Sequence, residues 1–203
     1  MAINKKIKLN KVIQILLLFL FVVNVSGGLF SPILAVFVTN FIFGATLKTV
    51  GFAVALFAVA KSIVQIPLAR RLDKKIGEKD DFYVMLIGGI ISILYAFGFI
   101  FIKSSLHLYI LSAIGGIGAA FLLAAYYGIF ARHVDRGSEG FEWSLYSTVG
   151  LTISVAIGSA IGGILADTFG FKVIFLMAGF LSVLATFLLL FLYPFLKKKD
   201  NKI

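Results

Sequence analysis

The stretch of sequence that decides the fold is residues 145–166, LYSTVGLTISVAIGSAIGGILA. It contains no charged side chain, and about 20 apolar residues are enough for one α-helix to cross the ~30 Å hydrocarbon core of a bilayer. Gly150, Ser154, Gly158 and Gly162 recur at every fourth position and therefore lie on one face of that helix. Small residues on one face allow a second helix to pack closely in lipid. The stretch therefore predicts a transmembrane helix that packs through its small face.

The rest of the chain contains five more long apolar runs. Together the runs lie at about 12–38, 49–69, 83–102, 108–131, 145–166 and 173–195. Of the 203 residues, 61% are hydrophobic and 14% are charged, whereas soluble domains have about 45–50% and about 25%. Only helices and closed barrels satisfy their backbone in lipid, and the alternating pattern of a barrel is missing. We therefore predict an all-α, polytopic membrane protein, with residues 1–203 forming a single transmembrane domain.

The basic residues indicate the orientation of this domain. Most of the 19 Lys and Arg fall at the two chain ends and in the loops at about 70–82 and 132–144. The positive-inside rule places these segments in the cytoplasm. The same distribution argues against a nucleic-acid partner, because the basic residues flank apolar runs and do not line one polar face. We predict a multi-pass protein of the cell membrane, embedded in the lipid bilayer, with both termini cytoplasmic.

A faint internal repeat divides the six spans into two blocks of three. The turn after the second span, LDKKIG at 72–77, is similar to the turn after the fifth, LADTFGFK at 165–172. Because three is an odd number, the two blocks have opposite orientations, and inverted repeats are typical of secondary transporters. Chance similarity between two turns that end helices is the alternative.

Lys61 is the most informative single residue, because it lies within the second span and no Asp or Glu lies in the middle of any span. A buried charge without a partner is costly, so water or an anionic ligand is its natural partner. A neutral or snorkelled lysine is the alternative. Asn24 and Ser31 share one face of the first span, which either lines a cavity or forms hydrogen bonds between helices. The candidate substrate-binding residues are Lys61, Gln65, Asn24, Ser31, Tyr126 and Tyr127.

The sequence offers little support for enzyme chemistry. It has no HExxH, no Walker-type loop and no nucleophile elbow. Cysteine does not occur, and His107 and His133 are too far apart to suggest a metal site. We expect Glu78, Asp80 and Asp81 to form a solvated turn. We therefore expect no enzyme activity, no cofactor and no metal.

Four segments resemble one half of a major facilitator superfamily transporter. In chain order they are PLARRLDKKIG at 67–77, GIGAA at 116–120, GLTISVAIGSAIGG at 150–163 and GILADTFGFKVIF at 163–175. The resemblance implies two inverted three-helix repeats and a further half that completes a twelve-span transporter. It also implies that Arg70, Arg71, Asp73 and Gly77 form a gating loop between the second and third helices.

The chain departs from the family pattern at several positions. The loop has Arg70 where the family has glycine, and Asp73 lies one residue early relative to Gly77. Ser112 stands where the family has a fourth-helix arginine, so an arginine-based coupling role does not carry over. Without a carboxylate in mid-membrane, facilitated transport or exchange fits better than a simple Asp/Glu proton relay.

The predicted function is a half-size secondary transporter of a small polar or anionic solute. It would act as a parallel homodimer by rocker-switch alternating access, with the first and fourth helices lining the cavity. The second and fifth helices would meet across the two halves, and the small face of Gly150, Ser154, Gly158 and Gly162 suits that contact. One alternative is a membrane scaffold that does not transport. Another is one subunit of a heterodimeric transporter.

Overall fold

The computed structural model describes residues 9–74 and 77–196, so the basic groups at 5–8 and 197–202 lie outside the described residues. The helices in chain order are α1 (Lys11–Phe30), α2 (Leu34–Phe41), α3 (Leu47–Asp73), α4 (Lys79–Gly98), η1 (Phe99–Phe101), α5 (Ser105–His133), α6 (Glu139–Leu145), η2 (Tyr146–Ile153), α7 (Ser154–Phe169), α8 (Phe171–Leu190) and η3 (Tyr193–Phe195). No strand occurs in this part of the chain. Six helical stretches are long and apolar enough to cross a membrane. The prediction of an all-α protein with six spans is confirmed.

Local sequence signals fix the ends of several spans. Asn10 caps α1, because its side chain accepts a hydrogen bond from the Ile13 amide. Ser104 caps α5 in the same way. Gly170 has φ +78 and follows the last residue of α7. A glycine adopts this left-handed conformation without strain, so α8 starts directly after it and runs back along the bundle.

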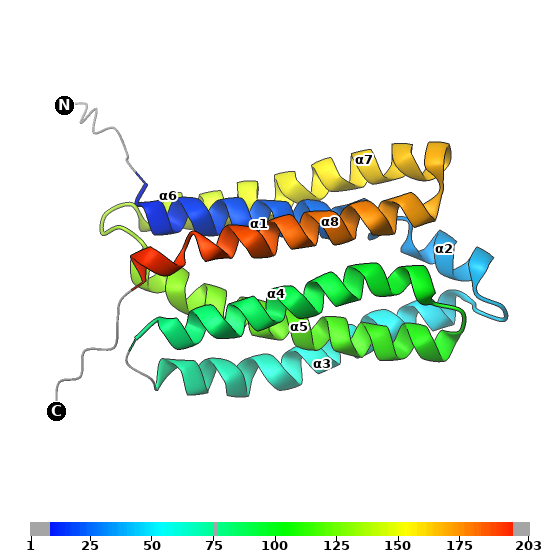
Figure 1. Ribbon diagram of the computed structural model, residues 1–203, viewed down its shortest axis with the longest axis horizontal. Coiled ribbons are helices and arrows are strands. Elements are labelled where there is room, and N and C mark those ends of the chain that lie inside the picture. The colour runs from blue at the N-terminus through cyan, green and yellow to red at the C-terminus, as the bar shows by residue number, and fades with distance from the viewer. Residues whose placement is uncertain (1–8, 75–76, 197–203) are drawn as a thin grey trace.

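The first span is shorter than its apolar run, which extends over 12–38. The helix α1 ends at Phe30, a turn follows, and the short helix α2 begins at Leu34 (Figure 1). Pro32 lies in this turn. Proline has no amide hydrogen to donate, and its ring clashes with the carbonyl four residues earlier, which would be that of Gly28. The predicted boundary is therefore corrected, and α2, with 8 residues, is too short to span a bilayer.

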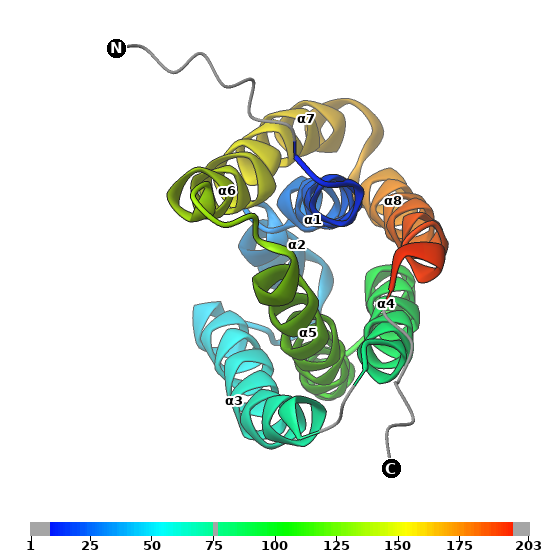
Figure 2. The ribbon, with the colours of Figure 1, turned by 90° about the vertical axis from the view of Figure 1, so that its left-hand side faces the viewer.

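The spans pack in an order that exposes an internal symmetry. The helix α3 packs on α5, as the helix α7 packs on α1. The helix α4 packs on α5, as α8 packs on α1, and α4 and α8 pack on each other (Figure 2). If α1, α3 and α4 are exchanged for α5, α7 and α8, respectively, the same pairs of neighbouring helices result. The bundle therefore consists of two three-helix repeats, which the odd number of spans inverts relative to each other.

A glycine in the first helix of each repeat makes a close contact with a neighbouring helix. A Cβ on Gly28 of α1 would lie 2.8 Å from the carbonyl oxygen of Val155. A Cβ on Gly116 of α5 would meet the carbonyl oxygen of Phe57 in the same way. Each glycine is the second of a Gly-Gly pair in the first helix of its repeat. The first helix of each repeat therefore approaches the backbone of a neighbouring helix through a glycine.

The small face of the fifth span packs inside the chain. A Cβ on Gly158 or Gly162 would strike backbone atoms of Val25 and Leu29 of α1, respectively. Ser154 is fully buried, and its hydroxyl donates to the Gly150 carbonyl at 2.6 Å. The expectation that this face meets a second subunit is therefore corrected, because α1 of the same chain already occupies it.

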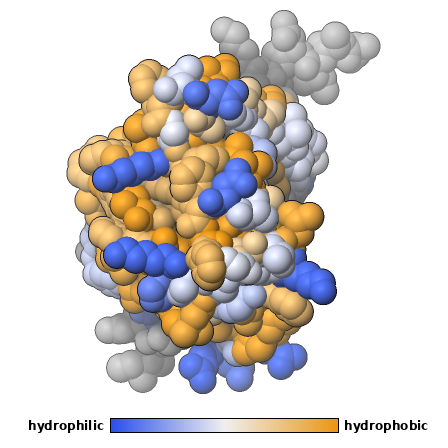
Figure 3. Space-filling view, turned by 90° about the vertical axis from the view of Figure 1, so that its right-hand side faces the viewer, coloured by the Kyte–Doolittle hydropathy of each residue, from blue (hydrophilic) through white to orange (hydrophobic). Residues whose placement is uncertain are grey.

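The apolar core is divided into two clusters, one toward each end of the bundle. One cluster surrounds Leu16, Met85 and Ile129, near the end where α1 begins and α5 ends. The other surrounds Phe37, Leu108 and Phe175, near the opposite end. At that opposite end the hydrophilic residues are scattered among apolar ones (Figure 3). The candidate site lies between the two clusters.

Candidate functional site

A cavity of about 410 Å³ lies near the middle of the bundle. Its walls come from α1, α3, α4, α5, η2 and α8, and the lining residues sit near the middle of most of these helices. Small-molecule sites usually have ~300–1,000 Å³ and are mostly apolar with a few polar groups. The cavity fits that description, and both three-helix repeats contribute to it.

Four of the six candidate binding residues line this cavity, namely Lys61, Asn24, Tyr126 and Tyr127. Ser31 lines a smaller neighbouring hollow, because it lies seven residues, or about 10 Å, beyond Asn24 along the helix. Gln65 does not line the cavity, since it lies one turn beyond Lys61 toward the end of α3. The structure therefore does not bring Ser31 and Gln65 together with the other four.

Lys61 is the only cationic side chain among the described residues that line the cavity. It is partly buried near the middle of α3, and next to it Ala60 packs on Gly116 of α5. The ion pairs of the described residues involve Arg132 and His133, and none of them reaches Lys61. No Asp or Glu is among the described lining residues either. The ammonium group therefore faces the cavity without a counter-charge from the described part of the chain.

Tyr126 has a fully buried side chain whose hydroxyl makes no hydrogen bond. Its ring is stacked on Phe130, with centroids 5.6 Å apart, and lies against Phe19 and Tyr146. A buried polar group without a partner costs about 1–3 kcal/mol. The aromatic neighbours fix the ring, so the hydroxyl is a pre-positioned and vacant hydrogen-bonding group at the cavity wall.

Tyr127 differs from Tyr126, because its hydroxyl is paired with that of Tyr146 at 2.9 Å. Tyr146 begins η2, an eight-residue π-helical stretch within the fifth span. Such stretches are rare in helices and are frequent at functional sites. Here the π-helical stretch supplies Tyr146 and Leu151 to the cavity wall.

Most of the remaining polar side chains of the wall use a donor inside the protein. The serines bond to backbone carbonyls or to each other, and Asn24 bonds to its own helix. The bonds are Ser26 Oγ to Ala178 O (2.8 Å) and Ser182 Oγ (3.0 Å), Ser92 Oγ to Gly88 O (2.9 Å), and Asn24 Nδ2 to Leu20 O (2.9 Å). The Lys61 ammonium and the hydroxyls of Tyr126 and Tyr95 are left as unused donors in the described wall, together with the second amide hydrogen of Asn24.

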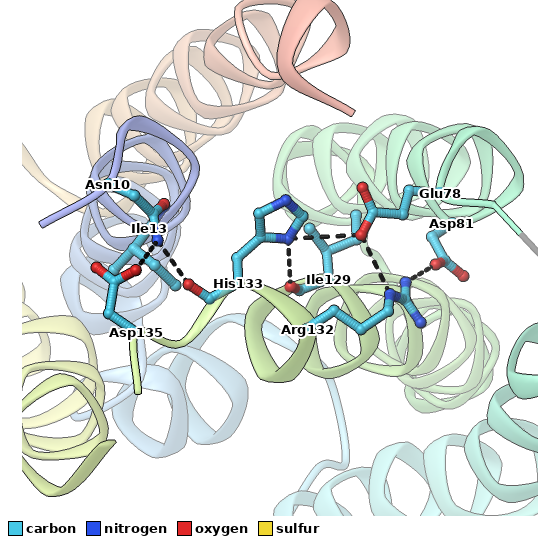
Figure 4. A network of polar contacts seen from close by, with 8 residues as sticks. All are labelled: Asn10, Ile13, Glu78, Asp81, Ile129, Arg132, His133 and Asp135. Atoms are coloured by element: carbon cyan, nitrogen blue, oxygen red, sulfur yellow. Dashed lines mark hydrogen bonds and ion pairs between the residues drawn. The ribbon is translucent and has the colours of Figure 1, made fainter. Parts of the chain in front are cut away.

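A second polar cluster ties α4, α5 and the start of α1 together at the end of the bundle where α1 begins (Figure 4). Arg132 of α5 donates to Asp81, and its Nε lies 3.2 Å from Glu78 Oε1. The His133 Nδ1 lies 3.5 Å from the same Glu78 oxygen. Glu78 and Asp81 are only 2% and 1% exposed. The expectation of a solvated turn is corrected for Glu78 and Asp81, which are buried and pair with Arg132, whereas Asp80 is exposed as expected.

The start of α1 joins this cluster through Asn10. Its Nδ2 donates to the His133 carbonyl and to Asp135 Oδ1, the latter at 3.3 Å. Its Oδ1 accepts from the Ile13 amide at 2.9 Å. One asparagine therefore caps α1 and also fixes the chain that leaves α5.

The predicted gating loop lies beside this cluster. Arg70, Arg71 and Asp73 are exposed at the end of α3. Gly77 has φ +124 and immediately precedes the buried Glu78. The predicted loop thus contributes the turn that leads into the cluster, while its charged side chains lie on the surface.

The comparisons with known proteins agree with this architecture. The family model described as Major Facilitator Superfamily matches residues 16–203. The chain belongs to the major facilitator superfamily. Its six spans correspond to one of the two six-helix halves of that fold, and the resemblance predicted from four segments is confirmed.

A relative within the superfamily is a protein of Methanocaldococcus jannaschii named "Uncharacterized MFS-type transporter MJ1560". The two sequences are 28% identical over 181 residues, which make up 88% of this chain and 44% of the relative. The chain therefore spans less than half the length of this superfamily member.

The sequence prediction missed three features of the superfamily fold in this chain. The aromatic residues Phe57, Tyr95 and Tyr146 line the cavity. Aromatic residues are common in membrane helices, so the sequence did not single these three out. The two Gly-Gly pairs were a usable signal, since one occurs in the first helix of each repeat. The ion pair of Arg132 with Glu78 could not be recognised from a local sequence pattern, because the two residues are far apart in the sequence.

Proposed function

We propose that this chain carries a secondary-transport site for a small polar or anionic solute and works by alternating access. The mid-bundle cavity, in which Lys61 has no ion-pair partner among the described residues, carries this proposal. Transporters of this superfamily bind their substrates near the bilayer midplane, where repeats meet. A charged group in mid-membrane is costly, and such residues commonly mark substrate or ion pathways.

The proposed motion is a rocking of rigid six-helix units. The Arg132 cluster ties α4 and α5 to the start of α1, and glycine contacts lock α3 on α5 and α7 on α1. A unit held by the Arg132 cluster and by the glycine contacts moves as one body. Its rocking then opens the cavity alternately to the two sides of the membrane. The basic residues at the end where α1 begins support a cytoplasmic location for that end.

A parallel homodimer is the proposed way to complete the twelve-span form. The helices α3 and α7 lie at the two ends of the arc of spans and are the least buried of the six (Figure 2). Each also has an exposed face of small residues. These residues are Gly51, Ala55, Ala58 and Ser62 on α3 and Ala156 and Ala160 on α7. Such faces suit close packing between helices in lipid, here between α3 of one copy and α7 of the other.

Uptake into proteoliposomes tests the transport proposal. A panel of solutes is first tested for a rise in the unfolding midpoint of the detergent-purified protein, and the solutes that raise it are then tested for uptake. We expect Lys61→Ala and Lys61→Gln to reduce uptake, while Lys48→Gln, on the same helix but outside the cavity, leaves it unchanged. Unchanged uptake of every transported solute by both Lys61 variants would show that the site is wrong. A failure of every solute to bind or move would favour a membrane scaffold.

A further inference from the structure

We infer that the cavity selects a monoanion with an apolar, preferably aromatic, body, and that Lys61 and Tyr126 hold its acidic group. The inference rests on the proposed function, because it names the class of solute that the transport site takes. It follows from the hydrogen-bonding capacity, the charge and the apolar surface of the cavity wall.

The hydrogen-bonding groups of the wall require an acceptor on the ligand. Among the described lining residues, the Lys61 ammonium and the buried Tyr126 hydroxyl are unused donors, as are the Tyr95 hydroxyl and the second amide hydrogen of Asn24. An ammonium can only donate, and a phenol donates readily to an oxygen anion. A carboxylate has two oxygens and so can accept from more than one donor. The side chains of Ser26, Ser92 and Ser182 already donate within the protein, so they offer a ligand no further donor.

The charge of the wall limits the ligand to one negative charge. Lys61 supplies a single positive charge, and no arginine and no acid occurs among the described lining residues. A dianion such as phosphate would keep one charge unpaired in a poorly hydrated site, which is unfavourable. A cation would meet the ammonium with no carboxylate to offset the repulsion.

The remaining wall surface favours an apolar body. Phe19, Phe30, Phe57, Leu122 and Leu123 line the cavity. Tyr95 lies between two of these rings, 6.1 Å from Phe30 and 5.9 Å from Phe57. A sugar would bury many hydroxyls against these side chains without partners. A ring between Phe30, Phe57 and Tyr95 would instead gain apolar burial and ring–ring contacts.

The first test uses the unmodified full chain and four probes that differ in one property each. The probes are 3-phenylpropionate, its neutral amide, 3-phenylpropylammonium and propionate. We expect 3-phenylpropionate to raise the unfolding midpoint. We expect the amide and propionate to bind at least about tenfold more weakly, since each lacks either the charge or the ring, and the ammonium to give no shift. Equal or tighter binding of the amide or the ammonium, or binding of none of the four probes, would overturn the inference.

Substitutions then test whether Lys61 and Tyr126 bind the acidic group of the ligand. We expect Lys61→Gln to abolish the preference for the acid over the amide. We expect Tyr126→Phe to weaken binding of 3-phenylpropionate by about tenfold, the value of one lost charge-assisted hydrogen bond, while the preference remains. Lys48→Gln and Tyr109→Phe are matched controls, because they lie on the same two helices and outside the cavity. A preference that survives Lys61→Gln would contradict the assignment.

The outcomes also separate this inference from the transport proposal. Uptake of a neutral sugar that depends on Lys61 would leave transport standing and refute the substrate class. Binding of 3-phenylpropionate at Lys61 without uptake of any solute would leave the site standing and refute transport.

Discussion

Gly28 of α1 and Gly116 of α5 lie in the first helices of two inverted three-helix repeats, and each lies against a backbone carbonyl of a neighbouring helix. Gly28 faces Val155 of the fifth span, and Gly116 faces Phe57 of the second. The two contacts bring the fifth span close to α1 and α3 close to α5. The position of Lys61 therefore depends on a glycine contact four residues away from it along α3.

Alanine at either glycine should destabilise the protein. The added methyl group of Gly28→Ala or Gly116→Ala would meet backbone atoms, which cannot move aside as a flexible side chain can. Overpacking of this kind costs about 1–3 kcal/mol. We expect both variants to lower the unfolding midpoint in detergent.

Two other glycines provide the controls for this experiment. Gly51 of α3 and Gly163 of α7 have no atom within 4 Å of an added Cβ. Alanine is a better helix former than glycine by about 1 kcal/mol, so Gly51→Ala and Gly163→Ala should be neutral or stabilising. If all four substitutions had the same effect, the close contacts would not determine helix packing.

Tyr126 and Tyr127 should respond in opposite ways to removal of the hydroxyl. The Tyr126 hydroxyl is buried without a partner, so Tyr126→Phe should leave the ligand-free protein unchanged or stabilise it by up to about 1–3 kcal/mol. Tyr127→Phe breaks the bond to Tyr146 and should destabilise the protein by about 0.5–1.5 kcal/mol. The measurement is chemical or thermal unfolding without added solute. A clear loss of stability in Tyr126→Phe would mean that its hydroxyl has a partner.

The six spans could be predicted from the sequence because the length of an apolar run is a local property. The length of the apolar run gave the wrong end for the first span. The run remains apolar beyond Phe30, although the helix is interrupted at Pro32. The spacing of Gly158 and Gly162 identified a packing face correctly. It could not identify the partner, because only the tertiary arrangement brings α1 to that face.

The candidate site was predicted in part, for related reasons. Lys61 and Asn24 were found because a polar group in mid-span is unusual in any sequence. Tyr126 and Tyr127 are adjacent and point about 100° apart on a helix. Which of them keeps a free hydroxyl depends on Tyr146, which lies 19 residues away in the sequence. The burial of Asp81 depends on Arg132, 51 residues away, so its sequence neighbours could not predict it.

Arg132 should be required for the stability of the polar cluster. Arg132→Met would leave Glu78 and Asp81 buried without this partner, which we expect to destabilise the protein by about 1–3 kcal/mol. Arg136→Met removes the same charge from an exposed position and serves as the control. We expect its effect to stay within about 0.5 kcal/mol.

A double-mutant cycle tests whether that loss comes from the ion pair itself. Asp81→Asn combined with Arg132→Met should be less damaging than the sum of the two single substitutions, because neither charge is then left alone. Strictly additive effects in thermal unfolding would show that Arg132 and Asp81 are not coupled.

Cysteine cross-linking can locate the proposed dimer contact, because the chain has no cysteine of its own. Ala58→Cys on α3 and Ala156→Cys on α7 lie on exposed small faces, at similar distances from the same end of the bundle. If α3 of one copy packs on α7 of the other, co-expressed single variants should form a cross-linked dimer in membranes with a short thiol reagent. Leu94→Cys on α4 and Phe180→Cys on α8 are also exposed and should remain monomeric. Cross-linking that is equal at both pairs would indicate random collision. Cross-linking confined to the control pair would place the interface on the opposite side of the bundle, where a second copy could not complete the cavity beside Lys61.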